Sequence, residues 1–199
     1  MGRNYEQLGD LDQARTAYAT AQAAGLPEAY SNLARLHILA EQPQQAISLL
    51  QAGLKLEQSD TVRYSMLKNL GWAYLSQANY PEAASHLKAA IQLNNEEASA
   101  YCLMAQLLES QGSTDVLANW ESCRRYASRM HPDQRQWLQE AEQYLATVQA
   151  KAQLENQSNV QLENQSNYSP IRSSSDGGIQ PSIQPPVSGL QHLATDGGE

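Results

Sequence analysis

The residue types that could carry out chemistry are few in this chain and lie far apart. Cys102 and Cys123 are 21 residues apart, without the CxxC pairing typical of zinc and redox sites, so their spacing disfavours a metal site and a disulfide alike. The four histidines are scattered, and the chain has no glycine-rich phosphate loop, no GxSxG and no HExxH. We therefore expect a protein that is not an enzyme and that uses neither a metal nor a cofactor.

The chemistry that remains is recognition, and it is concentrated in residues 67–90. A lysine, an asparagine and a tryptophan are interleaved there with an apolar helical stripe. The stripe reads L-x2-L-G-x2-Y from Leu67, with large side chains at i, i+3 and i+7, and A-x3-L-x2-A follows from Ala83. Small and large residues at these offsets predict two antiparallel helices that approach each other closely at Gly71.

The same pattern recurs along the chain, whereas a single amphipathic hairpin would be ordinary. Ala34 and Gly71 are 37 residues apart, with a small insertion near 57–61, and Gly71 and Ala105 are 34 residues apart. We expect His37 to be packed in the core. The matching positions of the three other units are Gly2, Tyr5, Gly9, Ala14, Tyr18 and Ala21; Tyr30, Leu33, Ala34, His37, Ala46, Leu50 and Gly53; and Tyr101, Met104, Ala105, Leu108, Val116, Trp120 and Cys123.

These units resemble the tetratricopeptide repeat, a two-helix unit of about 34 residues with the pattern W-x2-L-G-x2-Y…A-x3-F. The resemblance covers roughly residues 1–130. It implies an all-α fold, an α-solenoid of antiparallel helix pairs, because such units stack on their neighbours. We expect a repeat domain over residues 1–150, with units at approximately 1–26, 27–60, 64–97 and 98–131 and a capping helix at 133–152.

Two further segments complete the predicted organisation. The capping helix is expected to cover the last unit with an apolar stripe of Trp137, Leu138, Ala141, Tyr144, Leu145 and Val148. The motif QLENQSN then occurs at 153–159, where it could prolong the helix by a turn, and again at 161–167, before a stretch rich in Ser, Gly and Pro. Such sequence buries too little apolar surface to offset its ordering entropy. We expect a low-complexity disordered tail over 153–199, with disorder beginning near Gln157.

The first unit begins within its first helix, because Gly2 already occupies the eighth position of the repeat. A terminal repeat normally presents a capped, polar outer face. The expectation is a piece of a longer protein or, alternatively, a frayed first hairpin.

Charge and hydropathy exclude several classes of partner. The formal net charge is −8, and no basic cluster exceeds the pair Arg124–Arg125, whereas a nucleic-acid partner requires a basic stripe. The chain has no apolar run near the length of about 18 residues that a membrane span needs, and no basic-then-apolar leader. We expect neither a nucleic acid nor a membrane as partner, and a cytoplasmic location.

The resemblance also implies where a partner would bind, since the first helices of stacked units line a concave groove. Trp72 either anchors a ligand there, as aromatic hot-spot residues do, or shields the next first helix. The groove positions are Arg3 and Glu6 in the first unit; Asn32, Arg35 and Ile38 in the second; Lys68, Asn69, Trp72 and Leu75 in the third; and Cys102, Gln106 and Glu109 in the fourth.

Some members of the family clamp the C-terminal carboxylate of chaperones with lysine, asparagine and arginine side chains. Asn69 fits one position of that clamp, but Ser99 and Leu103 stand where lysine and arginine would be needed. The resemblance therefore argues against a chaperone-tail ligand and leaves an extended or helical peptide as the expected ligand.

We interpret the chain as a non-catalytic protein–protein interaction scaffold that binds a peptide or helix in the groove. The alternative is the repeat segment of a larger bacterial signalling enzyme, such as a Ser/Thr kinase. Self-association through the first hairpin is a third interpretation.

Overall fold

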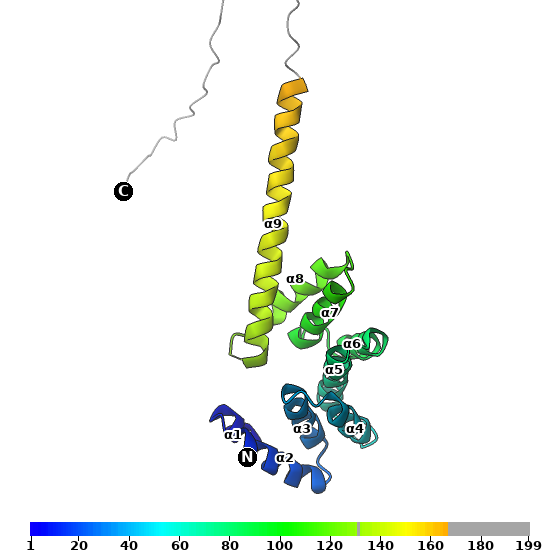
Figure 1. Cartoon of the computed structure of the whole chain (residues 1–199). Coiled ribbons are helices and arrows are strands. Elements are labelled where there is room, and N and C mark those ends of the chain that lie inside the picture. The colour runs from blue at the N-terminus through cyan, green and yellow to red at the C-terminus, as the bar shows by residue number, and fades with distance from the viewer. Residues whose placement is uncertain (131, 167–199) are drawn as a thin grey trace, which may run out of the picture. The chain divides into compact units, whose positions relative to one another are not determined.

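The computed structural model describes residues 1–130 and 132–166, and every regular element within these ranges is a helix (Figure 1). Residues Met1–Gln157 form one compact unit, which holds the repeats and all the contacts discussed below. The helices are α1 (Gly2–Gln7), α2 (Leu11–Ala23), α3 (Pro27–Leu39), α4 (Pro43–Gly53), α5 (Asp60–Ser76), α6 (Tyr80–Leu93), α7 (Ala98–Ser110), α8 (Val116–Tyr126) and α9 (Pro132–Ser166).

The packing of α1–α8 confirms the predicted all-α solenoid. Each odd-numbered helix packs against the helix that follows it, which gives four helix pairs among the described residues. The second helix of each of the first three pairs also contacts the first helix of the next pair, and α5 packs on both α3 and α7 (Figure 1). The first helices therefore share one side of the stack, which is the arrangement that a continuous groove requires.

Close contact within the third pair depends on Gly71. A Cβ atom at this position would lie 2.5 Å from Leu87 Cγ and 3.3 Å from the Ala83 carbonyl oxygen. The side chains of Ala83, Leu87 and Ala90 are completely buried against α5. The predicted alternation of small and large residues is confirmed, because only glycine lets α6 approach α5 this closely.

Several helices begin with residues suited to a helix start. Pro27, Pro43 and Pro81 stand in the first turns of α3, α4 and α6. Proline is tolerated there because first-turn N–H groups have no acceptor within the helix. Asp10 and Ser59 cap α2 and α5 by accepting a hydrogen bond from the backbone N–H three residues later. These local signals favour helix starts at the observed residues.

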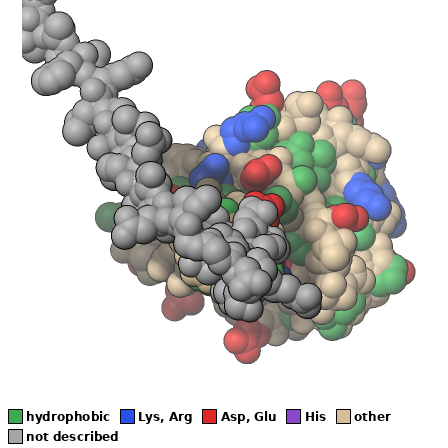
Figure 2. Space-filling view, turned by 90° about the horizontal axis from the view of Figure 1, so that it is seen from above, with side chains coloured by type: hydrophobic (Ala, Val, Ile, Leu, Met, Phe, Trp, Pro, Cys, Tyr) green, Lys and Arg blue, Asp and Glu red, His purple; other side chains and the backbone are tan. Residues whose placement is uncertain are grey.

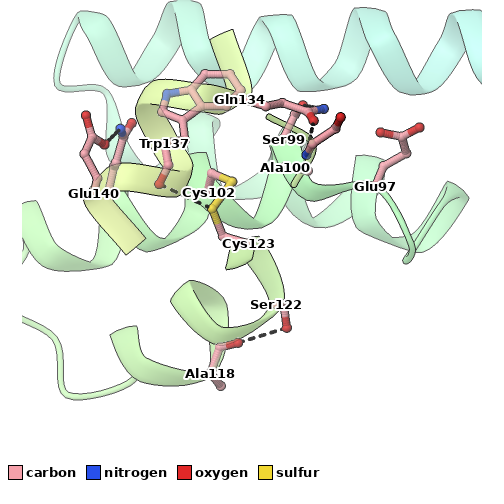
Figure 3. The surroundings of a disulfide bond; sticks show 12 residues. Glu97, Ser99, Ala100, Cys102, Ala118, Ser122, Cys123, Gln134, Trp137 and Glu140 are labelled. Atoms are coloured by element: carbon pink, nitrogen blue, oxygen red, sulfur yellow. Dashed lines mark hydrogen bonds between the residues drawn. A yellow bond between two sulfur atoms is a disulfide. The ribbon is translucent and has the colours of Figure 1, made fainter. Parts of the chain in front are cut away.

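A disulfide between Cys102 and Cys123 corrects the expectation from sequence spacing. It joins α7 to α8, both cysteines are completely buried, and their Cα atoms are 4.8 Å apart (Figure 3). Cys123 was expected to be a packed core residue, and it is, but Cys102 was expected to face the groove and does not. The 21-residue separation conceals the contact, because the pairing of the two helices, not the local spacing, brings the two thiols together.

The last described helix, α9, packs through the stripe expected of a capping helix. Trp137, Leu138, Ala141 and Leu145 are buried, and Trp137, Ala141 and Leu145 belong to the same apolar cluster as the core of α7 and α8. Tyr144 is half-buried against this cluster, and its ring centroid lies 6.2 Å from that of Trp120 in α8. The prediction of an amphipathic helix after the fourth pair is confirmed.

The end of α9 differs from the sequence expectation. A disordered tail was expected from residue 153, with disorder near Gln157, yet the helix continues to Ser166. The described side chains from residue 149 to 163 are exposed, so packing does not explain this extension. The segment is rich in Gln, Leu, Glu and Ala and lacks Gly and Pro, so a helix already nucleated on α7 and α8 can propagate through it. Residues 167–199, and the prediction made for them, lie outside the described residues.

On the molecular face seen in Figure 2, acidic and basic side chains are interspersed among neutral ones. This scatter agrees with the sequence, in which basic residues do not gather into a stripe. None of the helices in residues 1–130 and 132–166 is long and apolar enough to cross a lipid bilayer.

Candidate functional site

A cavity of about 530 Å³ opens on the side of the stack formed by the first helices, and we call it the groove cavity. It receives side chains from the first helix of every pair, from the start of α2, and from α9. Its described lining residues are Arg3, Glu6 and Gln7 of α1, Leu11 of α2, Asn32, Arg35 and Leu39 of α3, Lys68 of α5, Ser99 of α7, and Gln134 and Trp137 of α9.

An ion pair between Arg35 and Glu6 forms one wall of the groove cavity. A guanidinium nitrogen of Arg35 donates to Glu6 Oε2, and the two side chains are 19% and 18% exposed. The pair joins α3 of the second unit to α1 of the first. Burial, followed by the nearby Glu6 carboxylate, raises the pKa of Tyr18 to about 12. The pair thus brings one positive and one negative charge to the cavity wall.

Lys68 and Asn69 are adjacent in sequence but have different roles in the structure. Lys68 lines the cavity although its side chain is only 9% exposed, and its Nζ donates to Asn69 Oδ1 at 2.6 Å. Asn69 is 2% exposed, and its Nδ2 donates to both the carbonyl oxygen and the Oγ of Ser31, each at 3.0 Å. Asn69 therefore braces α5 against α3, and its hydrogen-bonding capacity is used between repeats.

Trp72 lies at the other end of the groove and contacts α9. Its ring centroid is 5.5 Å from that of Trp137, with the planes at 75°, an edge-to-face arrangement. Lys68 Nζ lies 5.8 Å from the Trp72 ring centroid, which adds a cation–π contact. The Trp72 ring thus packs on α9, and its two predicted roles, ligand anchor or shield of the next first helix, stay predictions.

Two hydrogen bonds join α9 to α7 as well. Gln106 Nε2 donates to Glu140 Oε2 at 2.6 Å, and Gln134 Nε2 donates to Ser99 Oγ at 3.2 Å. Trp137, which lies beside the disulfide in Figure 3, also receives a long contact from Cys123, whose Sγ is 3.8 Å from the Trp137 carbonyl oxygen. The first turns of α9 therefore cover the C-terminal half of the groove.

The structure brings together only part of the expected groove. Asn32, Arg35 and Lys68 line the cavity, together with Arg3 and Glu6. The other expected positions do not line it: Asn69 and Trp72 serve packing, Leu75 is half-buried in the apolar cluster, Gln106 is bonded to Glu140, Ile38 and Cys102 are buried, and Glu109 is exposed elsewhere.

Sequence reasoning missed the contribution of α9 to the cavity. Gln134 and Trp137 line it, yet they were assigned to a helix that only covers the last unit. A signal was present: Trp137 stands 34 residues after Leu103, one further repeat period. Continuing the period would have identified α9 as an additional first helix, whose inner face meets the groove.

Comparison with known proteins agrees with this fold. Two family models described as tetratricopeptide repeat match residues 5–70 and 68–116. The structure is similar to that of the Hsp90 co-chaperone Cns1 from Saccharomyces cerevisiae, with a TM-score of 0.50 at 14% sequence identity over 71% of this chain and 46% of that one. At this identity the likeness concerns the fold, and the match spans less than half of the Cns1 chain. No curated protein sequence matches significantly.

Proposed function

This chain belongs to the tetratricopeptide repeat family, whose fold is that of a protein–protein interaction scaffold, and on that premise we propose that it is a non-catalytic scaffold that binds a peptide or helix of a partner in the groove cavity. The observation that carries the proposal is the composition of the cavity wall. Side chains from every first helix and from α9 converge on one space of about 530 Å³. A cavity of this size lies within the range of ligand sites in proteins, and its polar and charged side chains could orient a ligand.

The packing of α9 supports a short binding site. Trp137 lines the cavity and packs on Trp72, so a ligand that displaced the Trp137 ring would have to break this edge-to-face contact. The open space instead lies beside Asn32, Arg35 and Lys68. We therefore propose that the N-terminal half of the groove receives a few residues of the partner, not a segment running the length of the stack.

The experiment that tests this function blocks the cavity without touching the core. Asn32 is half-buried on the cavity wall and has no part in the apolar clusters, so Asn32→Trp is expected to fill the space while the fold persists. Random twelve-residue peptides displayed on phage would be selected on the full chain. Capture of the selected peptides should fall at least about tenfold on the blocked variant, because the lost hot-spot contacts are worth more than 1.4 kcal/mol.

The matched control is Ser85→Trp, which adds the same bulk on an exposed position of α6. It should leave peptide capture unchanged, and circular dichroism should show equal helix content in both variants. Equal capture by Asn32→Trp and wild type would remove the groove assignment.

A chaperone-tail ligand is not proposed. Asn69 is bonded to Ser31, and Leu103, at a position where a carboxylate clamp needs a cation, is completely buried. The likeness to an Hsp90 co-chaperone therefore concerns the fold and does not bring its ligand to this chain. The alternative of a segment from a larger signalling enzyme finds no observation in the described residues that favours it.

Self-association through the N-terminal unit stays a proposal. Leu8 is 80% exposed, and Leu11 and Leu26 are about half exposed, so α1, α2 and the start of α3 present apolar surface that a second copy could cover. Light scattering over a range of concentrations, with wild type and Leu8→Glu, tests it. A mass that stays monomeric for both proteins rejects the proposal.

A cytoplasmic location also stays a proposal, and the Cys102–Cys123 disulfide weighs against it. Structural disulfides persist mainly in oxidising compartments. The mass of the protein isolated under alkylating conditions shows whether the two thiols are free in the cell.

A further inference from the structure

The charges around the groove cavity indicate which partner would fit, provided that the groove is the binding site proposed above. We infer that the cavity binds an acidic peptide segment, and that a side-chain carboxylate of this ligand replaces Glu6 on the Arg35 guanidinium. Glu6 is then a built-in competitor that occupies the principal cation of the site until a partner arrives.

The sign of the local charge is opposite to that of the molecule. Among the described lining residues, Arg3, Arg35 and Lys68 are cationic and Glu6 is anionic. The whole chain has 13 Lys and Arg against 21 Asp and Glu, a formal charge of −8. Because the molecule as a whole is acidic, the cations among the described lining residues favour the binding of an acidic segment at the cavity.

Arg35 and Glu6 lie on helices that are packed into the core to different extents. Arg35 lies on α3, a 13-residue helix with six buried residues, and Lys68 lies on α5, a 17-residue helix with nine. Glu6 lies on α1, which has six residues, no side-chain cap and a single buried residue, Gly2. A helix this short gains little stability from its own hydrogen bonds. The carboxylate can therefore withdraw while the guanidinium stays in place.

The geometry also favours side-chain carboxylates over a free chain terminus. The Asn69 amide, which could help to hold a terminal carboxylate, donates instead to Ser31. Three apolar residues, Leu11, Leu39 and Trp137, also line the cavity. The ligand that matches this wall is an internal segment in which Asp or Glu residues lie next to apolar ones, because the planar Arg35 fork binds a carboxylate well while the apolar side chains pack beside it.

The test uses the phage-selected peptides from the blocking experiment, which are fused at their C-termini and so have no free carboxyl end. Peptides captured by wild type and lost on Asn32→Trp should be enriched in Asp and Glu. When synthesised, the amidated and free-acid forms should bind the full chain equally. Binding should weaken as the salt concentration is raised from about 50 to about 500 mM. The screening length then falls from above about 10 Å to a few ångströms, which weakens the attraction between the carboxylates and the cations.

Glu6→Gln separates a competitor from a merely structural residue. Removing the competitor should tighten binding of the acidic peptide by up to about fivefold, the range of a partly exposed ion pair, whereas a lost brace would weaken it. Arg35→Gln should weaken binding by at least as much. The matched control is Glu142→Gln, which breaks the exposed Arg129–Glu142 pair, 3.0 Å long and outside the cavity, and should leave affinity unchanged.

The outcomes distinguish this inference from the proposed function. Peptides that depend on the open cavity but are neutral or basic would overturn the inference and leave the function standing. Tight binding only by the free-acid form, unchanged or weaker binding by Glu6→Gln, or binding insensitive to salt would also overturn it. Capture unaffected by Asn32→Trp would instead reject the groove itself.

Discussion

The two halves of the groove are built from equivalent repeat positions, yet their side chains have different roles. In the N-terminal half, Asn32, Arg35 and Lys68 surround open space. In the C-terminal half, Trp72 packs on Trp137 and the amide of Gln106 is bonded to α9. A position in the repeat thus determines which way a side chain points, whereas the next helix determines whether that side chain meets a partner or the protein's own core.

The two halves are also held together by different forces. In the N-terminal half, the ion pair between Arg35 and Glu6 joins α3 to the six-residue helix α1. In the C-terminal half, a buried disulfide joins α7 to α8, and buried apolar side chains of α9 pack in the same cluster as those of α7 and α8. Because partly exposed ion pairs contribute little and buried contacts contribute more, we expect the C-terminal half to be the stable support and the N-terminal half the adaptable one.

The largest expected effect tests the support function of α9. Trp137→Ala removes a buried indole that contacts Trp72, and it should lower the free energy of unfolding by about 3–5 kcal/mol. Asn32→Ala on the opposite half should change it by less than about 0.5 kcal/mol. Urea titrations of both variants measure the difference. Similar losses for the two variants would contradict the division of the groove into a packed half and an open half.

The second prediction concerns the disulfide between α7 and α8. Reduction, or the pair Cys102→Ala and Cys123→Ala, should cost about 2–4 kcal/mol, because the cross-link restricts the unfolded chain. Thermal unfolding of the oxidised and reduced wild type measures the loss, and the cysteine-free variant serves as the control that should not respond to reductant. If wild type and the cysteine-free variant unfold at the same temperature in oxidising buffer, the disulfide contributes nothing to the support.

The third prediction concerns the hydrogen bonds by which Asn69 of α5 holds Ser31 of α3. Asn69→Ala should cost about 1–3 kcal/mol, since it leaves buried groups of Ser31 and Lys68 without the amide that they contact. A double-mutant cycle with Ser31→Ala should show that the two losses are not additive. Additive losses, or an unchanged stability with altered peptide binding, would return Asn69 to the list of ligand-binding residues.

The smallest expected effect is a dependence of the free energy of unfolding on pH. Burial lowers the pKa of His86 on α6, whose ring stacks on Tyr74 of α5 with centroids 5.5 Å apart. The unfolded state then binds the proton more readily, so the stability contributed by neutral His86 is present above its ordinary pKa of about 6.5 and is lost as pH falls through its lower value in the folded state. His86→Gln should flatten this part of the pH–stability curve. If the dependence of stability on pH is the same in His86→Gln and in wild type, His86 does not contribute to it.

Much of the architecture could be predicted because it depends on local spacing. The glycine and alanine positions around Gly71, the four pairs and the apolar stripe of α9 all recur at fixed offsets, and the structure agrees with them. The end of α9 could not be placed in this way. The polar segment after residue 152 lacks a packing signal, and its helix depends on continuation from a helix that is already formed.

The candidate site was less predictable because it depends on coverage. Lys68 and Asn69 follow each other on one helix, and their residue types gave equal reason to expect a ligand, but one lines the cavity and the other holds α3. Gln134 and Trp137 looked like parts of a simple cap, although they complete the cavity wall. Such differences arise from the rotation of about 100° between successive residues of a helix and from which helix lies opposite each of them.

By itself, the sequence determined the repeat family, the order of the helix pairs and the face on which a groove would form. These properties follow from side-chain size at short, repeated intervals along a helix, so they can be read without the fold. The tertiary structure alone decided that Cys102 meets Cys123, that Trp137 closes one half of the groove, and that Glu6 meets Arg35 in the other. Each of these is a contact between distant residues, which exists only once neighbouring helices have packed.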